Sequence, residues 1–341
     1  MNTSPTPLPT VHDALARPLR DLRISVTDRC NFRCPYCMPR ALFGPDHAFL
    51  PRAALLSFEE IFRLAQVFVH LGVNKLRLTG GEPLLRRDLE RLVAQLATLT
   101  GVELAMTTNG VLLGRKAQAL RAAGLTRLTV SLDALDDATF LRMNDAHTPV
   151  AEVLAGIEAA QRAGFTGLKI NAVIQRGVNE HAVLDLARHF RGTGMTVRFI
   201  EYMDVGSSNG WRPADVFSAQ DMLALLRQQW VLQPVTGNPH AVAQEYRYAD
   251  GAGTVGLIAA VTQPFCQHCT RLRLSTDGQL FTCLFAGTGF DVKTLLRADL
   301  TDQALAEHLG LLWQQRQDQY SQLRFHAARA QPPKEMSYLG G

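Results

Sequence analysis

The chain has 341 residues, of which 47% are hydrophobic and 19% are charged, and its formal net charge at pH 7 is +4. This composition is typical of a soluble globular protein with one large or two modest domains, and it excludes a largely disordered chain. The cationic excess is too small and too scattered to predict nucleic-acid binding, although it is compatible with a local site for an anionic ligand.

The first residues carry no targeting signal that the sequence reveals. Residues 1–19 are rich in proline and lack the apolar core of a signal peptide, so we expect a flexible N-terminal segment. No run of about 18 apolar residues predicts a membrane span. We therefore expect a cytoplasmic protein without a membrane partner, in a compartment that keeps thiols reduced.

Short β-branched runs alternate with amphipathic segments over residues 20–205. The predicted strands are Leu22–Thr27, Lys75–Thr79, Glu103–Thr107, Arg127–Ser131, Gly167–Val173 and Thr196–Ile200. The predicted helices between them are Ser57–Leu71, Arg87–Ala97, Arg115–Ala123, Val150–Ala163 and Glu180–Phe190. Six strand–helix repeats of this kind favour a parallel sheet.

The two faces of these strands differ in polarity. One parity carries Leu, Ile, Val and Phe, which suits packing against outer helices, whereas the other is polar. The polar parity includes five basic residues, which are Arg23, Lys75, Arg77, Lys169 and Arg198. A closed, dry barrel would leave these charges unpaired, so we predict an α/β fold with an incomplete (β/α)6 TIM-like barrel whose interior is cationic and open to water.

The regular alternation of strands and helices ends after Glu201, and residues 206–330 predict a separate antiparallel α+β extension. A helix is expected over Ser218–Gln229, and further helices over Val292–Leu296 and Asp302–Leu312. The expected strands are Glu245–Tyr248, Thr254–Ile258, Arg271–Ser275 and Gln279–Cys283. Asp277-Gly278 predicts a hairpin turn between the last two. Residues 331–341 form a tail that ends in Gly340-Gly341.

All six cysteines fall into two triplets. Cys30, Cys34 and Cys37 follow the first predicted strand, whereas Cys266, Cys269 and Cys283 lie in the extension, where the hairpin returns Cys283 to Cys269. Disulfides are conceivable, but thiols this close together on one loop favour shared metal. A structural zinc site closes with four protein ligands, whereas an iron–sulfur cubane held by three cysteines keeps one iron open. His268 is a possible fourth ligand of the second set.

The first triplet resembles a family motif. Cys30-Asn31-Phe32-Arg33-Cys34-Pro35-Tyr36-Cys37 resembles the cluster loop of the radical S-adenosylmethionine superfamily, and Thr79-Gly80-Gly81-Glu82-Pro83 resembles its Gly-Gly-Glu motif. The resemblance implies a [4Fe–4S] cluster on the three cysteines. It also implies contacts with S-adenosyl-L-methionine, which would come from Tyr36, Gly81, Ser131 and Met203. A zinc knuckle, a plain glycine turn and ordinary core packing are the alternatives.

The second triplet narrows the resemblance. Phe265-Cys266-Gln267-His268-Cys269-Thr270-Arg271-Leu272-Arg273, with Cys283, is similar to the GTP 3′,8-cyclase family of molybdenum cofactor (molybdopterin) biosynthesis. Further family marks are Thr107-Thr108-Asn109-Gly110, Arg198-Phe199-Ile200-Glu201 and the final Gly-Gly. The resemblance implies a second [4Fe–4S] cluster, carried by the extension on Cys266, Cys269 and Cys283, and a tail that enters the active site.

The same resemblance assigns GTP contacts. It implies that Arg23, Arg77, Thr107, Lys169, Arg271, Leu272 and Arg273 contact GTP. Lys75 and Arg198 join this set from strand parity alone. Arg271 and Arg273 are further predicted to be catalytic and to tune the last reduction, because they lie between ligands of the second triplet. The alternative is that some of these cations pair with Glu103, Glu201 or Asp133 and only hold the barrel together.

The implied activity is that of a lyase that converts GTP to (8S)-3′,8-cyclo-7,8-dihydroguanosine 5′-triphosphate. The resemblance also implies a homodimer, a reducing electron donor and a downstream partner, cyclic pyranopterin monophosphate synthase. Two alternatives remain from the sequence. One is a radical S-adenosylmethionine enzyme that modifies a peptide with the help of an auxiliary cluster, and the other is a zinc-stabilised binding module.

Overall fold

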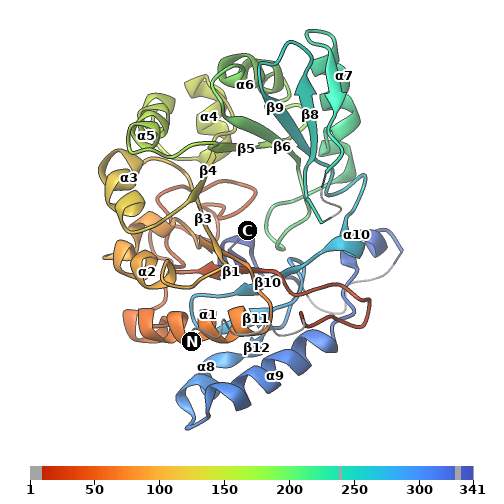
Figure 1. The fold of residues 1–341 in the computed structure, drawn as a ribbon. Coiled ribbons are helices and arrows are strands. Elements are labelled where there is room, and N and C mark those ends of the chain that lie inside the picture. The colour runs from red at the N-terminus through yellow and green to blue at the C-terminus, as the bar shows by residue number, and fades with distance from the viewer. Residues whose placement is uncertain (1–9, 238–239, 327–331, 341) are drawn as a thin grey trace, which may run out of the picture.

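The computed structural model describes residues 10–237, 240–326 and 332–340, and one curved sheet organises them (Figure 1). The twelve strands found among these residues are ordered β12-β11-β10-β1-β2-β3-β4-β5-β6-β9-β8-β7. The strands of the first half are β1 (Asp21–Ser25), β2 (Lys75–Thr79), β3 (Glu103–Thr108), β4 (Arg127–Ser131), β5 (Lys169–Ile174) and β6 (Thr196–Glu201). All six pair in parallel, each with the next along the chain.

Helices cover the outer face of these strands (Figure 1). They are α1 (Phe58–His70), α2 (Leu89–Leu96), α3 (Leu113–Ala122), α4 (Asp137–Asn144), α5 (Val150–Arg162) and α6 (Ala182–Phe190). Ser57 begins α1 with a capping box, in which its hydroxyl accepts from Glu60 N at 3.1 Å and Glu60 accepts from Ser57 N at 2.7 Å. Five of these helices match the predicted ranges closely, whereas α4 was not predicted.

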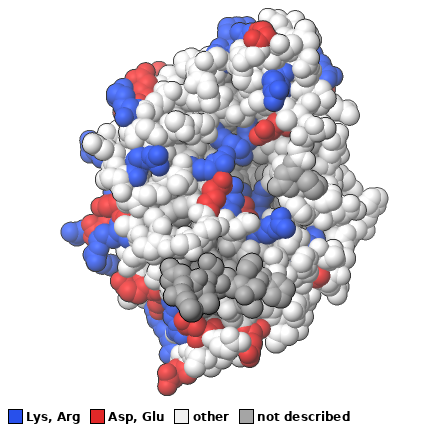
Figure 2. Space-filling view, in the orientation of Figure 1, with Lys and Arg blue, Asp and Glu red and all other residues white. Residues whose placement is uncertain are grey.

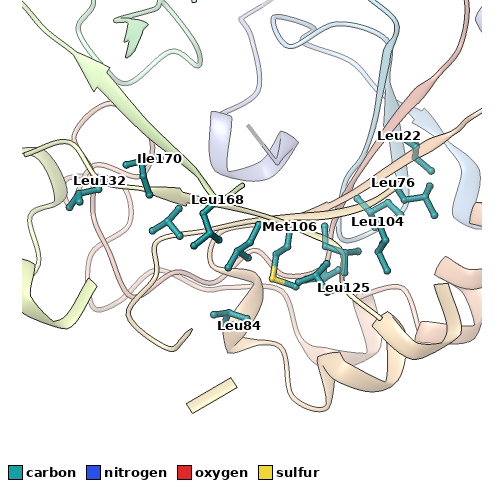
Figure 3. Packing of buried hydrophobic residues seen from close by; sticks show 14 of the residues in the cluster. Leu22, Leu76, Leu84, Leu104, Met106, Leu125, Leu132, Leu168 and Ile170 are labelled. Atoms are coloured by element: carbon teal, nitrogen blue, oxygen red, sulfur yellow. The ribbon is translucent and has the colours of Figure 1, made fainter. Parts of the chain in front are cut away.

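The hydrophobic core lies between the strands and these helices (Figure 3). The apolar parity of the strands fills it, including Leu22, Leu76, Leu104 and Ile170, none of which is more than 3% exposed. Full burial of such a side chain contributes about 1.5–3 kcal/mol. The apolar parity therefore faces outward and the polar parity inward, as the alternation predicts.

The second half of the chain extends the same sheet at both edges. Its elements are α7 (Ala219–Arg227), β7 (Leu232–Pro234), β8 (Gln244–Tyr248), β9 (Thr254–Ile258), β10 (Arg271–Leu274), β11 (Gln279–Phe281), β12 (Phe290–Asp291), α8 (Val292–Arg297), α9 (Asp302–Gln314), α10 (Tyr320–Leu323) and α11 (Met336–Leu339). Strand β10 pairs in parallel with β1, and β9 pairs in parallel with β6.

The prediction of a separate antiparallel module is therefore wrong in one respect. The predicted antiparallel pairs exist, including the β10–β11 hairpin over Asp277-Gly278, but their strands join the barrel sheet rather than a sheet of their own. The physical reason is that β1 and β6 would otherwise be exposed edges, and three strands of the second half of the chain cover each of them. Two short strands, β7 and β12, were not predicted.

Residues 10–19 are not a free tail. Val11 N donates to Leu71 O at 3.4 Å, and Leu19 N donates to Val11 O at 2.9 Å. Asp13, Arg17 and Leu19 are buried. The predicted flexible segment 1–19 thus includes a packed part, while residues 1–9 lie outside the described residues. Among the described helices, none has the length and apolar character needed to cross a membrane.

Candidate active site

A cavity of about 480 Å³ lies on the inner face of the sheet. Lysine and arginine side chains gather in the hollow that Figure 2 shows on this face of the molecule. The predicted site residues that line the cavity are Arg23, Tyr36, Lys75, Arg77, Thr107, Ser131, Lys169, Arg198, Met203, Arg271 and Arg273. Strand parity therefore brings together side chains from seven strands at one cavity.

Adjacent strands place three arginines in one row. Arg273 of β10 is in register with Arg23 of β1, which is in register with Arg77 of β2. Arg77 donates to Thr107 Oγ1 at 3.0 Å and to Thr129 Oγ1 at 3.3 Å. Within the described residues, the Nε atoms of Arg23 and Arg273 are buried without a hydrogen-bond partner. Donors left unpaired in this way are available to a ligand.

The arginine side chains that line the cavity repel one another. Burial, followed by the neighbouring charges of Arg271 and Arg273, holds the pKa of Arg23 well below its usual range. Burial and Arg271 likewise lower the pKa of Arg273 to about 10. Burial together with Arg77 and Arg271 lowers the pKa of Arg198 to about 9. A cavity that destabilises its own cations in this way is preorganised for a highly charged anion.

Only some of the cations pair with carboxylates. Lys75 Nζ lies 2.5 Å from Glu103 Oε1, and Lys169 Nζ lies 3.8 Å from Glu245 Oε1. Glu201 accepts instead from the backbone of Ala219, Val261 and Thr262 at 2.8–2.9 Å. For Lys75, and more loosely for Lys169, the ion-pair alternative thus applies, whereas Glu201 has a structural role that joins β6 to its neighbours.

The first cysteine triplet lies on the loop after β1. Arg33 Nη1 donates to the carbonyl oxygens of Cys30 at 2.8 Å and Phe32 at 2.7 Å, and Cys37 N donates to Cys34 O at 2.9 Å. All three thiols are free and partly buried. Burial raises the pKa of Cys34 well above its usual range, with the charges of Cys37 and Cys30 adding to the effect. The three thiols thus lie on one short, partly buried loop, which suits ligands of one metal cluster.

Two glycines after β2 allow the close approach of this loop. A Cβ atom on Gly81 would lie 2.3 Å from Arg29 O, and one on Gly80 would lie 2.6 Å from Thr27 O. Gly81 N donates to Thr27 O at 2.8 Å. Gly81 thus packs against the backbone that leads to Cys30, and it does not line the cavity. Its predicted contact with a cofactor remains a prediction.

The three other predicted cofactor contacts line the cavity, and Tyr36 belongs to the loop of the first triplet. Tyr36 Oη donates to Asp133 Oδ2 at 2.7 Å, which fixes the ring that follows Cys34. Ser131 ends β4, and Met203 follows β6. The carboxylate of Asp133, which also accepts from Val173 N at 2.8 Å, was proposed from the sequence only as an ion-pair partner of the basic residues.

The cysteines of the second triplet flank strands β10 and β11 in the sequence. Cys266 lies in a short 3₁₀ turn (Cys266–His268), Cys269 precedes β10 and Cys283 follows β11. Burial opposes ionisation of Cys269, but Arg316 and Arg271 together lower the pKa of this thiol. Phe265, Thr270 and Leu284 line the same cavity that Tyr36 lines. Neighbours of both triplets therefore face one cavity.

Each triplet offers three free thiols, which is the donor type that iron–sulfur clusters take. Within the described residues, no three His, Cys, Asp or Glu side chains converge closely enough to hold one metal ion. His268 is exposed at the surface, and its ring centroid lies 6.0 Å from that of His240.

Leu272 and the tail complete the set of predicted residues. The Leu272 side chain is buried in the hydrophobic core, on the opposite face of β10 from Arg271 and Arg273. In the tail, Met336 lines the cavity. Gly340 packs closely against β2, because a Cβ atom added to it would lie 2.2 Å from Thr79 Oγ1. The described part of the tail thus enters the barrel, while Gly341 lies outside the described residues.

Sequence reasoning missed several residues that line the cavity. Arg127 shares its strand parity with Thr129 and Ser131, so the same alternation could have found it. Asp21 also shares the polar parity of its strand. His240 and Glu245 come from the extension, and no local signal placed them near β5 and β6.

A partial barrel with a three-cysteine loop after its first strand defines the class of this protein. Residues 24–190 match the model of the radical SAM superfamily, and residues 195–322 match the model named Molybdenum Cofactor Synthesis C. The streptococcal protein SuiB, in its crystal structure with S-adenosylmethionine, has a similar fold, with a TM-score of 0.61, 15% sequence identity, and coverage of 92% of this chain and 69% of SuiB.

Curated relatives narrow the class. A protein named GTP 3′,8-cyclase from Acidothermus cellulolyticus is 57% identical over 92% of this chain and 88% of its own length. Proteins of the same name from Xanthomonas axonopodis pv. citri and Staphylococcus saprophyticus are 51% and 46% identical, and each match covers 97% of this chain and 99% of the relative. The chain belongs to the GTP 3′,8-cyclase family.

Proposed function

We propose that this protein converts GTP to (8S)-3′,8-cyclo-7,8-dihydroguanosine 5′-triphosphate, the first step of molybdenum cofactor biosynthesis. The observation that carries the proposal is the single cationic cavity faced by neighbours of both cysteine triplets. The names of the relatives and the match to the Molybdenum Cofactor Synthesis C model support the same reaction.

Cys30, Cys34 and Cys37 would hold one [4Fe–4S] cluster, and Cys266, Cys269 and Cys283 a second. When bound, the clusters and S-adenosyl-L-methionine supply the one-electron chemistry that removes hydrogen from C3′ of GTP and permits the C3′–C8 bond. Tyr36, Ser131 and Met203 would position S-adenosyl-L-methionine beside the first triplet, with Gly81 at the end of β2. The Gly-Gly tail would approach the same cavity.

The arginine side chains that line the cavity would hold the triphosphate. A triphosphate carries about four negative charges, and arginine donates paired hydrogen bonds to phosphate oxygens. Arg23, Arg77, Arg198, Arg271 and Arg273 have no carboxylate partner within the described residues, so their charges are available to such an anion. Lys75, Thr107 and Lys169 complete the contacts, and Leu272 would contribute through its backbone. Fixing the triphosphate in this way makes later steps effectively intramolecular.

Arg271 and Arg273 would also tune the final reduction. Both side chains line the cavity from β10, a strand that lies between Cys269 and Cys283 in the sequence. We expect Arg273→Ala to lower cyclisation about tenfold or more, because a charged hydrogen bond to substrate or to reduced product is lost. Full cyclisation by this variant in an anaerobic assay would remove the assignment.

The organisation and setting of the enzyme follow from the same proposal. The matches at 24–190 and 195–322 support a barrel over residues 20–205, an extension over 206–330 and a tail over 331–341. We further propose a cytoplasmic homodimer that receives electrons from a reducing donor. Its product would pass to cyclic pyranopterin monophosphate synthase.

Anaerobic incubation with GTP, S-adenosyl-L-methionine and dithionite tests the function. We expect 5′-deoxyadenosine together with a cyclised nucleotide, and about eight irons with sulfide per chain. Deoxyadenosine without the nucleotide would keep the chemistry and reject GTP as substrate. A native metal content of one or two zinc ions would instead support a binding module. A cationic cavity favours a triphosphate over a peptide, and binding of a peptide rather than GTP would overturn that preference.

A further inference from the structure

A buried charged network lies behind the second cysteine triplet, outside the cavity. It consists of Asp13, Arg17 and Arg316, and we call it the Asp13 network. Arg17 Nε lies 2.6 Å from Asp13 Oδ2, and Arg316 Nη1 lies 3.3 Å from the same oxygen. The three side chains are no more than 2% exposed. Full burial of three charged groups outside a binding cavity is uncommon and calls for a physical reason.

The Asp13 network holds the backbone of the second cysteine loop. Arg17 Nη1 donates to Cys266 O at 2.9 Å, and Arg316 Nη1 donates to Cys269 O at 2.8 Å. Each arginine therefore fixes the carbonyl group of one cysteine of the triplet. The backbone amides of Arg20 and Asp21 add bonds to Thr270 O at 3.2 and 3.1 Å. The segment before β1 thus fixes a loop that lies some 250 residues later in the chain.

Other contacts lock the two arginines in place. Arg17 Nη1 also donates to Asp318 O at 2.7 Å, and Trp313 Nε1 donates to Arg17 O at 3.1 Å. The guanidinium carbon of Arg316 lies 4.5 Å from the centroid of the Trp313 ring. Lysine could not reproduce this pattern. A guanidinium group presents several donors in one rigid plane, whereas lysine has a single ammonium group.

The charges of the network suit an anionic neighbour. Two guanidinium groups face one fully buried carboxylate, and the Asp318 carboxylate, 3.5 Å from Arg316 Nε, is 32% exposed. Arg17 Nη2 is buried without a hydrogen-bond partner in the described part of the chain. Cysteines that bind metal do so as thiolates, so three of them gathered on one loop repel one another. Fixed positive charge beside the loop offsets that repulsion.

We propose that Asp13, Arg17 and Arg316 are positioning residues for the second iron–sulfur cluster, which they support by fixing the Cys266–Cys269 loop and by supplying buried positive charge. This inference rests on the proposed function, because it requires a cluster on the second triplet. Nothing in the network contacts the cavity, so its effect on substrate would be indirect.

Arg17→Gln and Arg316→Gln test the proposal in the anaerobically purified, reconstituted enzyme. Arg63→Gln is the matched control, since Arg63 also bonds a carboxylate, Asp302 at 2.7 Å, and a backbone carbonyl, Leu296 O at 3.0 Å, and none of its bonds goes to a cysteine. Iron per chain, the electron paramagnetic resonance signals of both clusters and their reduction potentials would be measured. Formation of 5′-deoxyadenosine serves as a separate readout of the first cluster.

We expect iron to fall from about eight to about four per chain in both network variants, with the first cluster and deoxyadenosine formation retained. Where a variant keeps its second cluster, the potential of that cluster should shift to more negative values, because a nearby positive charge is lost. Arg63→Gln should keep both clusters. About eight irons with unchanged potentials in the network variants would overturn the proposal, and so would equal loss of both clusters.

Asp13→Asn keeps the shape of the network and removes its negative charge. This variant tests the proposal by the same cluster measurements if the glutamine variants do not fold. Loss confined to the second cluster supports the proposal, whereas intact clusters or parallel loss of both overturn it. The unmodified enzyme separates this test from that of the function. If it holds only one cluster, the proposed function fails first, whatever the variants do.

Discussion

Arg23 illustrates at the scale of single residues how the cavity favours ligand binding over stability. It lies in register with Arg273 and Arg77, and its Nε is buried without a partner in the described structure. Burial and neighbouring arginines hold its pKa well below the usual range. Unpaired cations of this kind destabilise the ligand-free protein, and a bound polyanion would reverse that effect.

We expect Arg23→Met to stabilise the ligand-free protein by about 1 kcal/mol and to weaken GTP binding by about tenfold or more. Denaturant unfolding and equilibrium binding measure the two effects. Lys75→Met is the control, because Lys75 already pairs with Glu103 and its removal should give no gain in stability. A lower unfolding free energy for Arg23→Met would show that Arg23 is structural.

Lys169 predicts a pH dependence. Burial, with Arg198 and Arg127, lowers its pKa to about 8, despite the opposing charge of Glu245. Lys169 therefore loses its proton, and its attraction for a triphosphate, as the pH rises through about 8. We expect GTP affinity to fall by about tenfold between pH 7 and pH 9 as this charge is lost. Lys169→Arg should remove this dependence, and an equally steep decline in that variant would assign it to another group.

The turn after β2 gives a prediction at the scale of secondary-structure elements. A Cβ atom at Gly81 would meet Arg29 O at 2.3 Å, so Gly81→Ala must displace the backbone that leads to Cys30. We expect this variant to lose the first cluster, about half of the iron, and to keep the second. Gly114→Ala, at a site with no heavy atom within 4 Å, is the control for iron analysis. Retention of all iron in Gly81→Ala would mean that the loop can move.

Most elements of the barrel are predictable because their cause is local. Ser57 and Glu60 mark the start of α1, and alternation marks β2 from Lys75 to Thr79. The α4 helix over Asp137–Asn144 lacks so clear a period, although Asp136 caps it by accepting from Thr139 N at 2.8 Å. The strands β7 and β12, with three and two residues, are too short for a sequence pattern to show.

The residues of the candidate site are predictable from the sequence where strand alternation determines them. Parity placed Arg23, Lys75, Arg77, Lys169 and Arg198 inward, and all five line the cavity. What could not be predicted depends on distant pairing. The register of Leu22 with Leu272 has no local signature, and neither do the contacts of Arg17 and Arg316 with the second cysteine loop.

The continuity of the sheet sets the behaviour of the whole molecule. Because β10 pairs with β1 and β9 with β6, the extension and the barrel share hydrogen bonds at both edges. Two parts joined in this way should unfold together rather than one after the other.

All three tryptophans, Trp211, Trp230 and Trp313, belong to the second half of the chain, so their fluorescence reports mainly on that half and its contacts. In an anaerobic urea titration we expect the fluorescence midpoint to coincide with that of far-ultraviolet circular dichroism, which reports on the barrel as well. Midpoints separated by more than the fitting error would indicate two independent units, and the shared sheet would then contribute little to cooperativity.

The pairing of β10 with β1 also has a consequence during synthesis on the ribosome. The first strand to emerge must wait for its second partner, β10, which is translated about 250 residues later and takes on the order of 10 to 50 seconds at about 5–20 residues per second. Throughout that interval the nascent barrel presents an open edge at Asp21–Ser25. Chaperone demand should therefore be greatest just before the ribosome completes the segment around Arg271–Leu274.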